Sequence, residues 1–323
     1  MSRIGTADAG DAGDAGDAGD AGDAGDVGAV SGLQRGGTIR PIGISPAPRQ
    51  VDGEDWWRGN KWPPADVLAP DGSLFWGHAD ICTPYPVRGW SRYYRSVAVL
   101  GDFVKTRWDR FERDLQRVLP TTEEAIKKEL KELVALIEYR PGVMSEALAQ
   151  RKNIEVYWKG LLSFNAVSHP WTCDLVEIVM RVGQFQAMHY KRLFNRARPS
   201  QLCPALMPPI EPPGHASFPS GHATEGYLLS LCLRKVLPEV LRTPADPANP
   251  TNQTDPEDES TPLLRLARRV ARNREVMGLH YRSDTRAGRI LAEKTAPLLL
   301  GLSCVVEIVE KACEEWTVPS PKR

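Results

Sequence analysis

From Thr121 to Glu315 the sequence repeats apolar residues at helical spacing, and this pattern constrains the fold more than any other feature. Thr121-Thr122-Glu123-Glu124 has the form of a capping box ahead of AIKKELKELVALIEY, where apolar residues recur at helical intervals. Alternation typical of strands is nearly absent. The sequence therefore predicts an all-α helical bundle, with further helical patterns at 143–165, 171–197, 221–237, 262–281 and 283–315.

The N-terminal segment has a different character. Asp8 to Gly25 is six perfect Asp-Ala-Gly triplets, and the tract contains no proline, which argues against a collagen triple helix. Small residues and repeated negative charge bury too little apolar area to offset the entropy of ordering. Residues 1–38 are therefore predicted to form a disordered tail.

The rest of the chain divides by composition. Residues 39–119 are rich in Trp, Pro and Gly and are predicted to form irregular segments and short helices packed on a main helical domain at 120–316. Within that domain, the polar, proline-laden stretch at 243–261 is predicted to be a surface loop, and residues 317–323 a C-terminal tail.

Charge balance argues against a nucleic-acid partner. Lys+Arg and Asp+Glu are 41 each, but residues 1–36 hold seven Asp and two Arg, a net charge of −5. The remainder then carries about +5, which is too weak to favour nucleic acid and which suits a small anionic ligand.

Cysteine and hydropathy patterns bear on the compartment. The six cysteines form no CxxC pair, so isolated buried thiols in a reducing compartment are expected. The longest uncharged stretch near the C-terminus, Ala296 to Val306, is far shorter than the roughly 20 apolar residues of a membrane-spanning helix. No apolar region follows the N-terminal MSRIGTADAG, so a cytoplasmic protein without a membrane partner is expected.

The first polar segment is KRLFNRARP, from Lys191 to Pro199. Lys191 and Arg198 are seven residues apart, two helical turns, so a continuous helix would place both on one face. Pro199 disfavours α geometry at Arg198, so the helix is expected to end near there. Taken alone, a basic helix end is also common as a solvated feature that complements the helix dipole.

The second segment is HASFPSGHAT, from His215 to Thr224. A Pro-Ser-Gly step before a helical pattern is a candidate oxyanion-binding nest, because Ser220 offers a hydroxyl and the N–H groups near Gly221 lie at a positive helix end. His222 can exchange protons near neutral pH. The alternative is an ordinary turn and helix cap.

The third segment is NREVMGLHYRSD, from Asn273 to Asp284. His280 and Asp284 have i,i+4 spacing, which lets the carboxylate hold one imidazole nitrogen and leaves the other as nucleophile or metal ligand. Arg274 adds a fixed cation. The alternative is a polar contact on a helix without a chemical role.

In order, the three segments contain Lys-x6-Arg-Pro, Pro-Ser-Gly-His and Arg-x5-His-x3-Asp, separated by 19 and 51 residues. This resembles the three-part signature of the superfamily of vanadium haloperoxidases and type 2 phosphatidic-acid phosphatases (PAP2), over about residues 120–315. Asn273 is a departure, because the family usually has Ser there, although Asn still offers hydrogen bonds. The resemblance implies a helical bundle of the PAP2/haloperoxidase type.

The resemblance also implies an anion pocket. In that superfamily the pocket holds phosphate or its analogue vanadate. By motif position, its oxygens would be neutralised by Lys191, Arg198 and Arg274, whose charged donors suit oxyanions. Ser220 and Gly221 would donate further hydrogen bonds.

The histidines would carry the chemistry. The counterpart of His280 bonds vanadium in the haloperoxidases, so that it is the implied metal ligand, and in the phosphatases it attacks phosphorus. Asp284 would orient it in either case. His222 is implied as the general acid–base.

His215 points to one of these chemistries. It lies seven residues before His222, where bromide-oxidising haloperoxidases look similar, and a loop histidine without a role is the alternative. The resemblance implies a haloperoxidase-like enzyme that uses vanadate and hydrogen peroxide to oxidise a halide, with bromide expected. Two alternatives stay open: a soluble phosphatase that hydrolyses phosphate monoesters through a phosphohistidine, and a non-catalytic helical binding protein. A homo-oligomer fits the tendency of related soluble enzymes to associate through helices.

Overall fold

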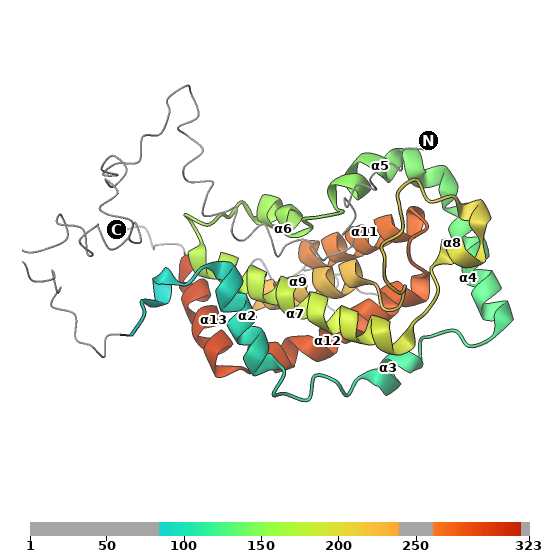
Figure 1. Cartoon of the computed structure of the whole chain (residues 1–323). Coiled ribbons are helices and arrows are strands. Elements are labelled where there is room, and N and C mark those ends of the chain that lie inside the picture. Colours follow the sequence, from blue (N-terminus) through green and yellow to red (C-terminus); the bar gives the residue numbers. More distant parts are fainter. Residues whose placement is uncertain (1–83, 239–260, 318–323) are drawn as a thin grey trace, which may run out of the picture. The chain divides into compact units, whose positions relative to one another are not determined.

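The computed structural model describes residues 84–238 and 261–317, and every regular element in these ranges is a helix (Figure 1). The predicted all-α class is therefore confirmed. In chain order the elements are η3 (Val87–Gly89), α2 (Arg92–Phe103), α3 (Glu112–Gln116), α4 (Glu123–Ala135), η4 (Ile137–Tyr139), α5 (Arg140–Ala149), α6 (Glu155–Leu162), α7 (Pro170–Phe194), α8 (Pro199–Leu202), η5 (Pro204–Leu206), α9 (Gly221–Val236), α11 (Pro262–Val276), α12 (Arg282–Leu300) and α13 (Ser303–Glu315).

Several sequence predictions fall outside the described residues. These are the disordered tail at 1–38, most of the surface loop at 243–261, and the C-terminal tail beyond Thr317. Pro84 to Trp90 belongs to a separate compact unit, in which the Tyr85 hydroxyl donates to the Gly89 carbonyl at 3.0 Å. The helices from α2 onward belong to the other unit, and the domain boundary at 119/120 stays a prediction.

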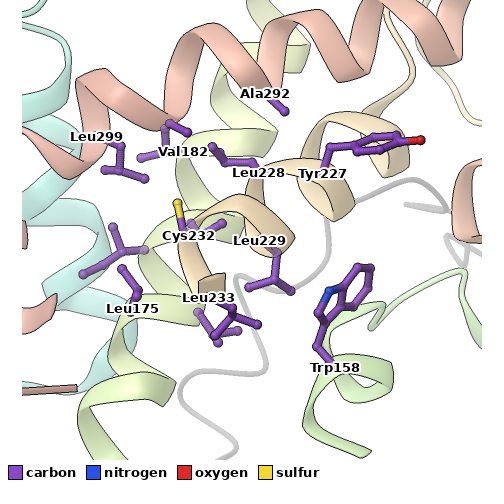
Figure 2. Close-up of a cluster of buried hydrophobic side chains, with 14 of the residues drawn as sticks. Trp158, Leu175, Val182, Tyr227, Leu228, Leu229, Cys232, Leu233, Ala292 and Leu299 are labelled. Atoms are coloured by element: carbon purple, nitrogen blue, oxygen red, sulfur yellow. The ribbon is translucent and has the colours of Figure 1, made fainter. Parts of the chain in front are cut away.

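Helix α9 is the central element of the bundle. It packs against α7, α11 and α12, and thirteen of its sixteen residues are buried. Figure 2 shows its side chains surrounded by apolar groups of the neighbouring helices, including Trp158 and Leu299. A helix that is covered on all sides must satisfy its own polar groups, and Ser230 does so by donating to Leu263 and accepting from Trp158 Nε1.

Close contact between α9 and α12 depends on Gly288. A Cβ atom there would lie 2.8 Å from both the Ala223 Cβ and the Ser220 carbonyl oxygen, nearer than real contacts allow. Because the obstructing atoms include backbone, they cannot turn away. The absence of a side chain at this position therefore lets the start of α9 lie directly on α12.

Helices α2 and α13 cover α7, and charged groups fix both contacts. Asp174 of α7 pairs with Arg92 at 3.1 Å and with Arg95. Glu315 of α13 accepts from the backbone N–H groups of Trp171 and Thr172 at 2.7 and 2.9 Å. Trp171 and Thr172 are in the first turn of α7, where the N–H groups have no partner within the helix. The Glu315 carboxylate accepts from these N–H groups and complements the dipole of α7.

Four predicted helices differ in their boundaries. The pattern at 143–165 is two helices, α5 and α6, and the pattern at 283–315 is divided into α12 and α13 at Gly301 and Leu302. The pattern at 171–197 ends at Phe194, where Asn195 takes the left-handed conformation, and the pattern at 262–281 ends at Val276. The start of α4 agrees more closely, because Thr122 caps it by accepting from the Ala125 N–H.

The cysteines are free thiols where they are described. Cys173 and Cys232 are buried as predicted, whereas the prediction is wrong for three others, which are half-buried: Cys203, Cys304 and Cys313. None of the described helices combines the length and apolar character that crossing a bilayer requires.

Replacing Gly288 by Ala should lower the free energy of unfolding by about 1–3 kcal/mol, because the added methyl group forces α9 and α12 apart. The measurement is urea unfolding followed by circular dichroism. Gly160→Ala is the matched control, since nothing lies within 4 Å of the added atom, and it should stabilise α6 by about 0.5–1 kcal/mol. Equal effects of the two substitutions would contradict this account of the contact.

Candidate functional site

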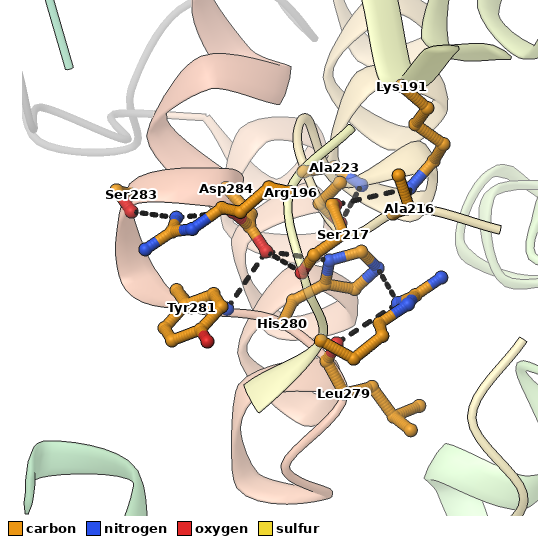
Figure 3. Close-up of polar contacts among 12 residues, drawn as sticks. Lys191, Arg196, Ala216, Ser217, Ala223, Leu279, His280, Tyr281, Ser283 and Asp284 are labelled. Atoms are coloured by element: carbon orange, nitrogen blue, oxygen red, sulfur yellow. Dashed lines mark hydrogen bonds and ion pairs between the residues drawn. The ribbon is translucent and has the colours of Figure 1, made fainter. Parts of the chain in front are cut away.

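The centre of the candidate site is the carboxylate of Asp284, which is fully buried. Its Oδ2 accepts from His280 Nδ1 at 3.1 Å, from the Tyr281 N–H at 3.0 Å and from the Ser217 hydroxyl. Its Oδ1 accepts from Arg196 at 2.7 Å. Figure 3 shows these donors gathered around the carboxylate from three stretches of the chain. A buried charge costs several kcal/mol unless it is paired, and here every donor contributes to that pairing.

This environment keeps Asp284 ionised. Burial alone raises the pKa of the carboxyl, but the His280 hydrogen bond and the Arg196 charge outweigh it and lower the pKa from 3.8 to about 2. At neutral pH the group is therefore an acceptor only.

The partners of His280 define its tautomer. Because Asp284 can only accept, Nδ1 carries the proton, and because the Arg198 guanidinium can only donate, Nε2 offers its lone pair to NH1 at 3.1 Å. The ring is fully buried between these two contacts. Nε2 is thus the atom of His280 that can act as a nucleophile or ligand.

Lys191 and Arg198 meet the same strip of backbone. Lys191 Nζ donates to the carbonyls of Ala216 and Ser217 at 2.9 and 3.2 Å, and Arg198 Nε donates to the His215 carbonyl at 3.0 Å. Both side chains are almost completely buried. Two cations therefore lie beside residues 215–217 next to His280.

The local geometry behind this arrangement differs from the prediction. α7 ends at Phe194, four residues before Arg198, which has extended backbone angles at the start of α8. Lys191 and Arg198 hence do not share a helix face, because the left-handed Asn195 turns the chain between them. They converge through the loop instead.

His280 and Asp284 likewise are not a pair on one helix. His280 lies in the turn after α11, whereas Asp284 is in the first turn of α12 and reaches back to the ring. Gly278, at φ +76°, ends α11, and the Leu279 N–H bonds the Arg274 carbonyl at 3.0 Å. Glycine adopts this left-handed conformation without strain, and it is common just after the last turn of a helix. His280 follows two residues later, in the turn between α11 and α12.

Ser220 and Gly221 begin α9, as the sequence predicts. The Ser220 side chain caps the helix by accepting from the Ala223 N–H at 3.3 Å. The Ser220 N–H donates to the Asp284 backbone carbonyl at 3.0 Å, which joins the start of α9 to the start of α12. The positive end of α9 thus lies beside the residues that hold His280.

His222 and Arg274 bond the end of α5. His222 Nε2 donates to the Gln150 carbonyl at 2.7 Å, and Arg274 donates to the Ala147 carbonyl. Asn273 donates to the Gln150 side chain at 2.9 Å. The hydrogen bonds of the motif residues therefore form two groups, one around His280 and one at the end of α5.

Two residues of the site, Arg196 and Glu129, could not be identified from the sequence motifs. Arg196 donates to Asp284 and also to Glu129 at 2.9 Å, and its guanidinium lies 3.6 Å from the centre of the Tyr281 ring. Glu129, on α4, accepts from the Ser283 N–H at 2.7 Å. Arg196 lies inside the first segment, but its link to a carboxylate 67 positions away has no counterpart in any local pattern.

His215 lies beside Arg198 in a surface depression. Its side chain is half-buried, and its Nδ1 is 3.0 Å from Arg198 NH2. An open depression of about 660 Å³ is lined there by residues 195–198 and 212–216 together with Ser200 and Gln201. Arg198 therefore joins His280 inside the protein to His215 at a solvent-accessible surface.

The side chains of the candidate site differ from those that usually coordinate a bare metal cation. Among residues 84–238 and 261–317, no three or more His, Cys, Asp or Glu side chains gather closely enough to hold one. A single imidazole beside cationic donors fits an oxyanion such as vanadate or phosphate, whose charge the cations balance. No protein-family model matches this sequence, and no curated protein is significantly similar to it.

Because of Asp284, the free energy of unfolding should decrease at acid pH. Its folded-state pKa of about 2 is below the ordinary 3.8, so its contribution of about 2 kcal/mol is complete above the unfolded pKa and is lost as the pH falls towards 2. Unfolding of the wild type and of Asp284→Asn should differ by a constant amount from pH 7 to 5. The difference should then shrink between pH 4 and 2, and one that persists unchanged at pH 2 would contradict this assignment.

Proposed function

We propose that this chain is a vanadate-dependent haloperoxidase-like enzyme, which oxidises a halide with hydrogen peroxide at an oxyanion bound to His280, and that bromide is its halide. The observation that carries the proposal is the chain of contacts from Asp284 through His280 and Arg198 to His215. It combines a fixed imidazole lone pair, a cation and a second histidine in a surface depression.

The residues fit the anion that the proposal requires. His280 Nε2 would be the ligand, because Asp284 holds the other ring nitrogen. Lys191 and Arg198 would balance the charge, and the N–H groups at Gly221 would add donors at the positive end of α9. Bound vanadate would supply the Lewis-acid centre for peroxide.

Arg198 has a specific part in this scheme. Its NH1 now donates to the lone pair of His280 Nε2 and to the Leu279 carbonyl at 3.0 Å. When an oxyanion binds, the guanidinium would transfer the first of these hydrogen bonds to an anion oxygen, which frees Nε2. The planar group can keep its bond to the His215 carbonyl while it does so.

The remaining histidines would handle protons and halide. His222, on the first turn of α9, donates from Nε2 to the Gln150 carbonyl, so it would exchange protons with the reactants through its other ring nitrogen, in the role of a general acid–base. His215 would hold the halide or a proton beside Arg198 in the surface depression. The half-buried position of His215 gives small anions access from solvent.

Phosphate-ester hydrolysis is the second candidate, because Asp284, His280, Arg198 and Lys191 serve it equally well. In that reaction His280 Nε2 would attack phosphorus, the P–O bond to the alcohol would break, and His222 would give the alcohol its proton. Water would then cleave the phosphohistidine. His215 has no part in this chemistry, so its contact with Arg198 is the observation that favours the peroxidase.

One purified sample assayed for two reactions should separate the candidates. With orthovanadate and hydrogen peroxide it should oxidise bromide, and it should do so only after vanadate loading. Asp284→Asn should reduce this activity by about 10–100-fold, because His280 loses its fixed tautomer. Bromide oxidation without vanadate would exclude the proposal, and hydrolysis of an aryl phosphate that is lost in His280→Ala would establish the phosphatase instead.

His215→Ala should lower bromide oxidation by about 100-fold, the lower range for loss of a proton-transfer group, and should alter its pH profile. His189→Ala is the matched control, since that half-buried ring of α7 packs against Trp108, and the substitution should leave the rate unchanged. Equal rates for His215→Ala and the wild type would remove His215 from the mechanism.

A further inference from the structure

A second pocket, of about 370 Å³, lies between α11 and α12 over Tyr227 of α9. Its walls carry five arginines: Arg268, Arg272, Arg282, Arg286 and Arg289. The first two are on α11 and the other three on α12. None of them belongs to the anion site around His280.

Helical spacing separates this pocket from the His280 site. Arg268, Arg272 and Glu275 follow one face of α11 at i, i+4 and i+7, and Arg282, Arg286 and Arg289 follow one face of α12 with the same spacing. Residues two positions apart point to opposite sides of a helix. Arg274 and Asp284, which are each two positions from a pocket arginine, therefore face away from it.

Arginines outnumber carboxylates five to one among the described residues that line the pocket. The carboxylate among these residues is that of Glu275, which is buried and pairs with Arg272 at 2.5 Å. Burial raises the pKa of Glu275, while Thr285 and Arg272 act in the opposite direction. Arg289 pairs with Glu293 outside the pocket at 3.0 Å, and its guanidinium lies over the Tyr227 ring.

The two helices that line the pocket each contribute a row of arginines to it. Guanidinium groups bind phosphate oxygens bidentately, so several of them around one hollow match a ligand with more than one phosphate. A volume of about 370 Å³ lies within the range of small-molecule sites, which favours a small ligand over a duplex or a bilayer.

We propose that the arginine pocket between α11 and α12 binds a small ligand that carries at least two phosphate groups. The ligand binds apart from His280, so this site does not depend on the function proposed above.

Titration calorimetry of the full chain with inorganic pyrophosphate tests this site. Arg268→Gln/Arg286→Gln removes one exposed arginine from each wall, and it should weaken pyrophosphate binding by about 10-fold or more. Arg265→Gln/Lys294→Gln is the matched control, because it removes the same charge from α11 and α12 outside the pocket and should change binding less than about 2-fold. Both pairs are changed at the surface, and urea unfolding checks that the variants fold alike.

Two further experiments test which site binds pyrophosphate and whether the phosphate of the natural ligand belongs to a lipid. Arg198→Gln alters the His280 site and should leave pyrophosphate binding intact. Loss of binding in Arg198→Gln with retention in the pocket variant would overturn the proposal, as would equal weakening by the pocket and control pairs. Vesicles containing phosphatidic acid identify the other source of phosphate: if they displace pyrophosphate and their binding needs the same two arginines, the ligand is a lipid headgroup and the small-ligand proposal is wrong.

Discussion

The pairing of the buried Asp284 carboxylate is the interaction on which the candidate site depends. Its oxygens receive donors from Arg196, Ser217 and the turn at His280, so it joins three segments that are far apart in the sequence. A carboxylate in this position would destabilise the fold without these partners. The Asp284 carboxylate in turn holds these partners in place, and its hydrogen bond with Nδ1 sets the orientation of the His280 ring.

The sequence predicted the parts of this arrangement that local rules govern. The start of α9 after Ser220 follows from a capping side chain and helical periodicity. The contact of His280 with Asp284 was also predicted, although it forms between the turn after α11 and the first turn of α12, and not along one helix. The sequence predicted the helix ends less well, because two turns depend on backbone conformations that the periodicity does not contain. Asn195 stops α7 early, and Gly278 separates His280 from α11.

The contacts that no local pattern contains come from distant segments. The carbonyl of Gln150 accepts a hydrogen bond from the His222 ring. Glu129 of α4 forms an ion pair with Arg196, which lies in the first motif. Arg140 similarly donates to the carbonyls of Leu206 and Val276. A backbone carbonyl offers no signal in the sequence, since every residue has one, so such partners become visible only once the chain is folded.

The burial of α9 has a consequence for where the sequence can vary. Its first turn carries Ser220, Gly221 and His222, while the rest of the helix lies at the centre of the core. Local opening of such an element requires nearly the full free energy of global unfolding, so its amide hydrogens should exchange slowest. Substitutions are consequently tolerated more easily at residues 212–216, which line the surface depression beside Arg198, than on α9 itself.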